Sequence, residues 1–233
     1  MVLAFRGTET TKWKDIATDA NFLPAGFNAE RVSDGGEGPQ VHSGFLQAFD
    51  SVRAQLMSLV DIILGSDEGP WQVYVTGHSL GGALATLMSY ELASSAAQKR
   101  RDINVVMYNY GSPRVGNIRF AKEYNELVPD SHRLVNGIDG VPRVPLLLDY
   151  CHVEHGVYID KDGSISMKSP TANTLEDEDV YVDYVAKVVG ERAAKDALDV
   201  VATLQGGDAV SAHMEDCYYD TLKLCAAKRI DQA

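Results

Sequence analysis

The sequence has few cysteines, no long apolar run and fewer basic than acidic residues. Its 3 cysteines in 233 residues are too few, and odd in number, for a disulfide framework. No apolar stretch approaches the ~20 residues that cross a bilayer, so we expect no integral membrane segment. Lys and Arg number 21 against 33 Asp and Glu, which gives a net charge of −12. Because an acidic surface repels phosphate, nucleic acid is not an expected partner.

The cysteines and the amino-terminus bear on the compartment. Cys217 and Cys225 are expected on one helix, ~12 Å apart, too far for a disulfide. Reduced thiols favour an intracellular over a secreted setting. The first residues, MVLAFRGT, are typical of a core strand and lack the regions of a signal peptide. We therefore expect that the native chain either begins here or has a further segment upstream. The sequence gives no oligomeric state.

Apolar runs alternate with segments of helical period along the chain. This order predicts an α/β fold with a central, mostly parallel sheet flanked by helices. The predicted strands lie at 2–5, 71–77, 104–110 and 133–136, and the predicted helices at 44–63, 81–97 and 118–127, with an acidic helical start near 175–185. Asp162-Gly163 predicts a hairpin turn. No linker divides the sequence, so we expect one domain over 1–233.

A G-x-S-x-G pattern lies in the segment VYVTGHSLGGA at 73–83, with Ser79 at its centre. A β-rich run precedes it and a helical run follows it, the context of a nucleophile elbow. A serine on such a tight turn is pushed out of the sheet edge, and the following helix directs its N–H groups at developing negative charge. The alternative, a glycine-rich turn that holds a serine by chance, leaves this context unexplained. Ser79 is the predicted nucleophile.

A serine nucleophile needs a base, and the base needs an acid that orients it. In α/β-hydrolases the acid follows the serine along the chain and the histidine comes last. Asp139 follows a short apolar strand and precedes a proline, so it is better placed as the acid than Asp130 or Asp149. Chain order disfavours three histidines as the base, namely His42, His78 and His132. The residues alone leave His213 open against the pair His152 and His155.

A series of segments in this order resembles the class 3 lipases, the filamentous-fungal triacylglycerol lipases with their plant and protist relatives. The segments are AFRGT at 4–8, VHSGF at 41–45, VTGHSLGGA at 75–83, YGSPRVGN at 110–117, VNGIDGVPRVP at 135–145, CHVEHGVYI at 151–159 and AHMEDCYYDTL at 212–222. The resemblance spans nearly the whole chain. It implies an α/β-hydrolase fold and a lipid or other ester substrate at an oil–water interface, with no cofactor.

The same resemblance assigns roles to particular residues. Ser79 corresponds to the nucleophile, Asp139 to the acid in the family's D-x-V-P pattern, and His213 to the late histidine that serves as the base. Thr8 and Leu80 correspond to the donors of the oxyanion hole. Two histidines receive other roles: His152 matches a non-catalytic histidine beside the site, and His78 is expected to be structural.

Residues 9–20, directly after Thr8, lie where lipases of this group carry a lid. Trp13 and Ile16, with Ala17 and Ala20, form one narrow apolar stripe at helical spacing. An ordinary surface helix packed on the core would show the same stripe. The position beside the expected oxyanion donor favours a mobile lid, with Trp13 and Ile16 turned toward lipid at an interface.

The sequence leaves two alternative functions open and contains two patterns that resemble metal sites. The first alternative is an esterase for soluble or feruloyl-type esters, and the second is a non-catalytic lipid- or protein-binding module on the same fold. No metal is expected, because neither the turn around Asp162 nor the cluster at 152–155 has the spacing of a calcium or zinc site. Relatives in this family begin with a helix and strands that this sequence lacks, so we also consider an amino-terminal truncation and a bare sheet edge.

Overall fold

The computed structural model describes residues 1–7, 24–27, 38–65, 69–99, 102–137, 139–145, 150–153, 156–167 and 207–230. A six-stranded sheet lies at the centre, and its strands are β1 (Val2–Phe5), β4 (Trp71–His78), β5 (Ile103–Tyr110), β7 (Ser131–Asn136), β9 (Gly156–Ile159) and β10 (Ile165–Ser166), in that spatial order. Pairing is parallel from β1 through β9, and β10 is antiparallel to β9. The predicted mostly parallel sheet is thereby confirmed.

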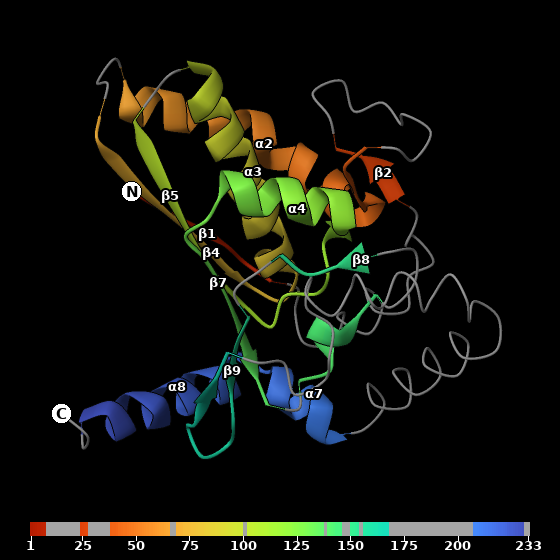
Figure 1. Cartoon of the computed structure of the whole chain (residues 1–233), viewed down its shortest axis with the longest axis vertical. Coiled ribbons are helices and arrows are strands. Elements are labelled where there is room, and N and C mark those ends of the chain that lie inside the picture. The colour runs from red at the N-terminus through yellow and green to blue at the C-terminus, as the bar shows by residue number, and fades with distance from the viewer. Residues whose placement is uncertain are drawn as a thin grey trace.

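Helices cover this sheet as an α/β fold requires. α2 (Ser43–Leu64), α3 (Leu80–Lys99) and α4 (Ile118–Leu127) lie together on one side of the sheet, whereas α7 (Gly207–His213) and α8 (Glu215–Ile230) lie beside β9 (Figure 1). α3 is rich in alanine and leucine and contains no proline, which favours a helix. Its side chains are buried along much of its length because it packs between the sheet and the other two helices. The fully buried core includes Phe49, Val75, Leu87, Met107 and Phe120.

A second sheet of four strands was not predicted from the sequence. It consists of β2 (Pro24–Gly26), β3 (Gln40–His42), β6 (Gly116–Asn117) and β8 (Tyr150–Cys151), all antiparallel to their neighbours. Strands of 2 or 3 residues are too short to show an alternating pattern, so periodicity does not reveal them. This sheet anchors the start of α4, because the Asn117 side chain accepts a hydrogen bond from the Phe120 N–H at 2.9 Å.

The predicted hairpin forms between β9 and β10, and its turn is held by side chains. The Asp162 carboxylate accepts hydrogen bonds from the Ser164 hydroxyl at 2.8 Å, from the Ser164 N–H at 3.0 Å and from Lys228 Nζ at 3.0 Å. These bonds lower the pKa of Asp162. Lys228 belongs to α8, so the turn fastens α8 to the sheet. Among the described residues, no cluster of histidine, cysteine and carboxylate side chains could hold a metal ion.

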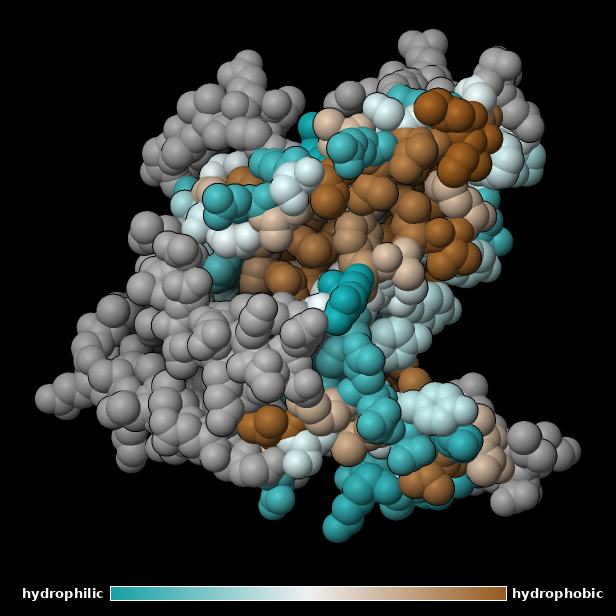
Figure 2. Space-filling view, turned by 180° about the vertical axis from the view of Figure 1, so that it is seen from behind, coloured by the Kyte–Doolittle hydropathy of each residue, from teal (hydrophilic) through white to brown (hydrophobic). Residues whose placement is uncertain are grey.

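Apolar side chains are exposed at the end of the sheet remote from the elbow. Seen from behind, apolar residues gather mainly over the upper part of the described surface (Figure 2). Val2 at the edge of the sheet is 65% exposed, and Leu59, Ile62 and Ile63 near the end of α2 are also exposed. Because α2 leads to the amino end of β4, these side chains of α2 lie away from the carboxyl end, where Ser79 follows.

Several predicted features lie outside the described residues. They include the candidate lid at 9–20 with Trp13 and Ile16, the oxyanion candidate Thr8, the acidic region near 175–185, and the alternatives Asp149 and His155. In the described part of the chain, no helix combines the length and the apolar character needed to cross a bilayer. All three cysteines lie in the described part of the chain and form no disulfide, and Cys217 and Cys225 share α8 as predicted.

Candidate active site

Ser79 lies on a strained turn between β4 and α3. Its φ of +57° makes it the one non-glycine residue with a positive φ among the described residues. The turn is held by the Ser79 N–H, which donates to the Tyr110 carbonyl at 2.9 Å, and by the Gly82 N–H, which donates to the Ser79 carbonyl at 2.9 Å. Backbone strain at a non-glycine residue persists only where the surroundings enforce it, and such residues cluster at functional sites. The turn has the geometry of a nucleophile elbow, with Leu80 as the first residue of α3.

The end of β1 passes directly over this turn. A Cβ atom built on Gly81 would lie 2.3 Å from the Phe5 carbonyl oxygen, and one built on Gly7 would lie 2.6 Å from the His78 carbonyl oxygen. No side chain fits at either position without moving backbone. The glycines of G-x-S-x-G and of FRGT therefore allow the two backbones to touch, and the chain leaves Gly7 beside Ser79.

Gly81→Ala is expected to destabilise the protein by about 2 kcal/mol or more, because the added methyl group overpacks a site bounded by backbone. Urea unfolding followed by circular dichroism measures the change. Ser58→Ala on the exposed face of α2 is the control, with an expected change within about 0.5 kcal/mol. Equal midpoints for Gly81→Ala and the wild type would contradict the close contact between β1 and the elbow.

The structure brings Asp139 and His213 together. His213 Nδ1 lies 2.9 Å from Asp139 Oδ2 and 3.1 Å from Oδ1, although the residues are 74 positions apart. Both side chains are buried, at 0% and 2% exposure. An ionised carboxylate only accepts, so Nδ1 carries the proton and Nε2 of the neutral ring is an acceptor. This tautomer can take a proton from a nucleophile, as a general base must.

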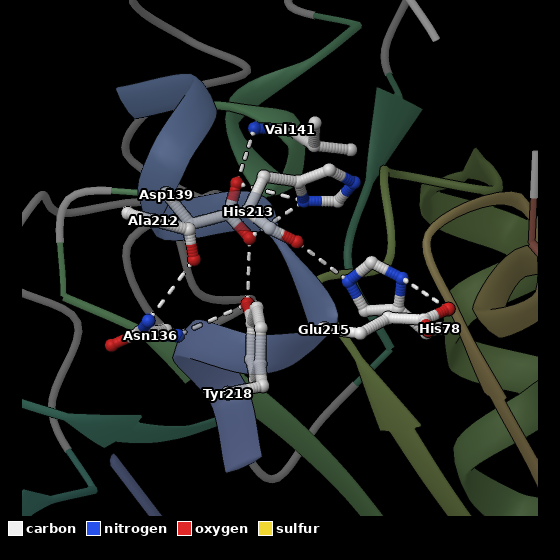
Figure 3. Close-up of polar contacts among 8 residues, drawn as sticks. All are labelled: His78, Asn136, Asp139, Val141, Ala212, His213, Glu215 and Tyr218. Carbon is white, nitrogen blue, oxygen red and sulfur yellow. Dashed lines mark hydrogen bonds and ion pairs between the residues drawn. The ribbon is translucent and has the colours of Figure 1, made fainter. Parts of the chain in front are cut away.

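Two further hydrogen bonds fix the Asp139 carboxylate. The Val141 N–H donates to Oδ1 at 2.9 Å, and the Tyr218 hydroxyl donates to Oδ2 at 2.6 Å (Figure 3). Burial and the neighbouring Asp139 carboxylate raise the pKa of Tyr218, so its phenol stays protonated and donates. Sequence reasoning missed Tyr218. The only signal was its place shortly after His213 in a pair of tyrosines, of which Tyr218 is 4% exposed and Tyr219 is 62% exposed.

The other described histidines have structural partners. His42 caps α2, since its Nδ1 accepts from the Gly44 N–H at 3.1 Å. His132 Nε2 lies 3.1 Å from the Asp130 carboxylate. Asp130, the alternative candidate for the acid, is therefore paired with His132. His152 lies between β8 and β9, and its Nε2 donates to the Pro142 carbonyl at 2.6 Å. Burial, with the nearby Arg133 and Arg114, holds the pKa of His152 well below its usual range. Of the described histidines, only His213 bonds Asp139.

Tyr218→Phe is expected to lower kcat about tenfold with little change in KM, because a hydrogen bond to a charged group contributes about 1.5–3 kcal/mol. The phenylalanine ring keeps the packing and removes the hydroxyl, which donates to Asp139 and also accepts from the Asn136 N–H at 3.1 Å. Steady-state kinetics on a soluble ester measure the effect. Tyr219→Phe on the same helix is the matched control and should behave as wild type, whereas an unchanged kcat for Tyr218→Phe would show that Asp139 needs no such donor.

The sheet, the elbow at Ser79 and the buried Asp139–His213 pair together define an α/β-hydrolase fold. The profile of the class 3 lipase family, described as "Lipase (class 3)", matches residues 2–148. The chain belongs to this family.

Known proteins of the family include enzymes on several lipids. The chain is 35% identical over 164 residues to phospholipase A1-Igamma2, chloroplastic, of Arabidopsis thaliana, which covers 62% of this chain and 30% of that protein. It is 35% identical over 173 residues to secreted mono- and diacylglycerol lipase 1 of Fusarium solani, covering 71% and 47%. Among solved structures, a triacylglycerol lipase with a serine-protease triad matches with a TM-score of 0.57 at 30% identity, covering 69% of this chain and 57% of that one. The chain thus spans only part of these relatives.

Proposed function

We propose that this protein is a serine hydrolase that cleaves carboxylic ester bonds of lipids, acylglycerols above all. The observation that carries the proposal is the buried hydrogen bond between Asp139 and His213 beside the elbow that holds Ser79. The names of the relatives support the lipid substrate, since they state phospholipase A1, mono- and diacylglycerol lipase, and triacylglycerol lipase.

In the proposed reaction Ser79 Oγ attacks the ester carbonyl carbon while His213 Nε2 takes the hydroxyl proton. Asp139 holds the imidazole by its Nδ1–H and stabilises the imidazolium that forms. The tetrahedral intermediate collapses, His213 returns the proton to the leaving alcohol, and an acyl-enzyme on Ser79 remains. Water then attacks the acyl carbon by the same route and releases the fatty acid. The reaction draws on no cofactor.

The oxyanion hole of this proposal consists of the backbone N–H groups of Leu80 and Thr8, with the Thr8 hydroxyl. Leu80 follows the nucleophile and is the first residue of α3, so its N–H belongs to the amino end of the helix, which favours negative charge. The close approach of Gly7 to the elbow supports a role for the next residue along the chain. One such donor contributes about 3 kcal/mol to the stabilisation of the transition state.

We further propose that residues 1–233 form one domain and that 9–20 act as its lid, with Trp13 and Ile16 turned toward lipid. The apolar stripe of this segment and its place directly after Thr8 support the proposal. A lid of this kind excludes water from the site and opens at an interface. It would distinguish a lipase from an esterase for soluble or feruloyl-type esters.

Trp13→Ser is expected to lower the rate on an emulsified triglyceride at least about fivefold, because burial of a large apolar side chain in lipid is worth about 1–3 kcal/mol. The rate on a soluble short-chain ester should not fall. Lys14→Ser, next to it on the polar side of the stripe, is the control. If Trp13→Ser kept the wild-type rate on the emulsion, the proposal that residues 9–20 act as a lid would be wrong.

The experiment that tests the proposed function measures hydrolysis of an emulsified triglyceride, an emulsified phosphatidylcholine and a soluble short-chain ester, with Ser79→Ala as the blank. We expect turnover of the triglyceride that rises sharply once the substrate exceeds its solubility. Turnover of the soluble ester alone would favour the esterase. Preference for phosphatidylcholine would place the protein with the phospholipases A1. No cleavage by folded protein would favour the non-catalytic binding module.

We also propose that the protein is located inside the cell. The three cysteines support it, because they are present as thiols and not in disulfides. The names of the relatives include both a secreted and a chloroplastic protein, so they favour neither. Fractionation of cells that express the native gene tests the proposal, and recovery of the protein from the medium would overturn it.

A further inference from the structure

The side chain of His78, directly before Ser79, contacts the segment that carries His213. Its Nε2 lies 2.8 Å from the His213 carbonyl oxygen, across 135 positions of sequence. A carbonyl oxygen only accepts, so His78 Nε2 carries the proton and donates it. The ring also lies against the His213 ring, with 4.6 Å between the centroids and 32° between the planes. His78 thus touches both the backbone and the imidazole of His213.

Burial and His213 favour the neutral ring of His78, whereas the carboxylates of Glu215 and Asp139 oppose them. Burial and the neighbouring His213 lower the pKa of His78. Glu215, at the start of α8, has its carboxylate 3.8 Å from His78 Nδ1, and the Tyr218 ring meets the His78 ring edge-on at 5.4 Å (Figure 3). Because His78 Nε2 donates its proton to a backbone carbonyl, this nitrogen is not the base that accepts the proton of Ser79.

The last carbonyl groups of α7 are hydrogen-bonded from two strands of the sheet. A helix leaves its final carbonyls without partners inside the helix, and other groups must satisfy them. The Asn136 side chain, at the end of β7, donates to the Ala212 carbonyl at 3.0 Å. His78, at the end of β4, donates to the next carbonyl, that of His213. β4 leads to Ser79 and β7 leads to Asp139. Each of these two strands therefore also binds the end of α7, the helix that carries His213.

We propose that His78 is a positioning residue that fixes His213 relative to Ser79 through its Nε2–H bond to the His213 carbonyl. The inference rests on the proposed function, since it concerns the base of that reaction. β4 ends at His78 and Ser79 is the next residue. The bond from His78 therefore ties the position of His213 to the strand that positions the nucleophile. Asn136 does the same for β7 and Asp139, and the two bonds together locate one imidazole between two partners.

The size of the effect follows from the geometry of proton transfer. A misplacement of ~1 Å at a reacting group costs up to ~100-fold in rate. Loss of the bond also removes a donor from a buried carbonyl group, which shifts the end of α7 toward solvent. The defect concerns the transition state and not the binding of substrate, so it should lower kcat and leave KM nearly constant.

The test compares His78→Leu, which removes the donor, with His78→Gln, whose side-chain amide N–H lies as many bonds from Cβ as Nε2 does. Both are assayed with a soluble ester for kcat and KM, and with a fluorophosphonate that labels reactive serines. We expect His78→Leu to lower kcat and the labelling rate about tenfold or more at constant KM, and His78→Gln to recover most of the loss. His132→Gln, on β7 of the same sheet, is the matched control and should behave as wild type.

The outcomes separate this inference from the proposed function. Wild-type activity for His78→Leu, or a His78→Gln variant as slow as His78→Leu, would overturn the positioning role while ester hydrolysis stands. If wild-type protein is neither active nor labelled, the proposed function fails and this inference with it. Should His78→Leu not fold, His78→Asn replaces it, because its shorter amide does not reach the carbonyl; equal rates for the glutamine and asparagine variants would then overturn the inference.

Discussion

Ser79→Ala is expected to lower kcat for ester hydrolysis by ~10⁴-fold or more, with KM nearly unchanged. In the proposed reaction the hydroxyl oxygen forms the acyl-enzyme, and no neighbouring group in the described site can replace it. The Ser79 side chain is small and lies on a turn held by backbone hydrogen bonds, so alanine should leave the fold intact. Any residual rate would come from the oxyanion donors and substrate binding alone.

The measurement is steady-state hydrolysis of a soluble ester, with thermal unfolding to show that the variant is folded. Ser89→Ala is the matched control, because Ser89 is also a buried serine, on the helix that follows the elbow, and its hydroxyl donates to the Ala85 carbonyl at 2.8 Å. It should retain wild-type kinetics. A Ser79→Ala variant with more than about one-hundredth of the wild-type kcat would show that another residue is the nucleophile.

Asp139→Asn is expected to lower kcat by ~10⁴-fold, because it reverses the tautomer of His213. The Val141 N–H donates to Oδ1, so the amide oxygen of asparagine takes that position. Its NH₂ group then occupies the place of Oδ2 and donates to His213 Nδ1. The His213 proton moves to Nε2, and the ring can no longer accept a proton from Ser79. The Tyr218 hydroxyl can turn to accept from the amide, so the fold should tolerate the change.

Kinetics on a soluble ester again measure this loss, and Asp130→Asn is the control. Asp130 also pairs with a histidine, His132, at 3.1 Å, but its side chain is 45% exposed and lies at the opposite end of β7. We expect wild-type kcat for Asp130→Asn. Equal losses for the two variants would show that the effect is general to carboxylates near β7 and not specific to the Asp139–His213 pair.

The elbow was predictable because its pattern is local. G-x-S-x-G needs a strand before it and a helix after it, and both are visible in the hydrophobic period of neighbouring residues. Asp139 was also predictable, since it follows a strand whose end must lie at the same edge of a parallel sheet as that of β4. Local sequence therefore placed the proposed nucleophile and the proposed acid on adjoining parts of one sheet edge.

The base could not be placed in the same way. His213 reaches Asp139 across 74 positions, and nothing in the sequence between them fixes that distance in space. Only the family resemblance chose it over His152, which the structure places against the Pro142 carbonyl. Tyr218 was missed because which of two adjacent tyrosines faces inward depends on where α8 begins. The short strands of the second sheet carry no period, so they too required the folded chain.

Covalent labelling tests whether Ser79 is a nucleophile that His213 activates. The protein is incubated with a fluorophosphonate, digested, and mapped by mass spectrometry at successive times. We expect a single adduct on Ser79, formed at least about 100-fold more slowly in His213→Ala. An adduct on another residue, or equal labelling of Ser79 with and without the His213 imidazole, would contradict it.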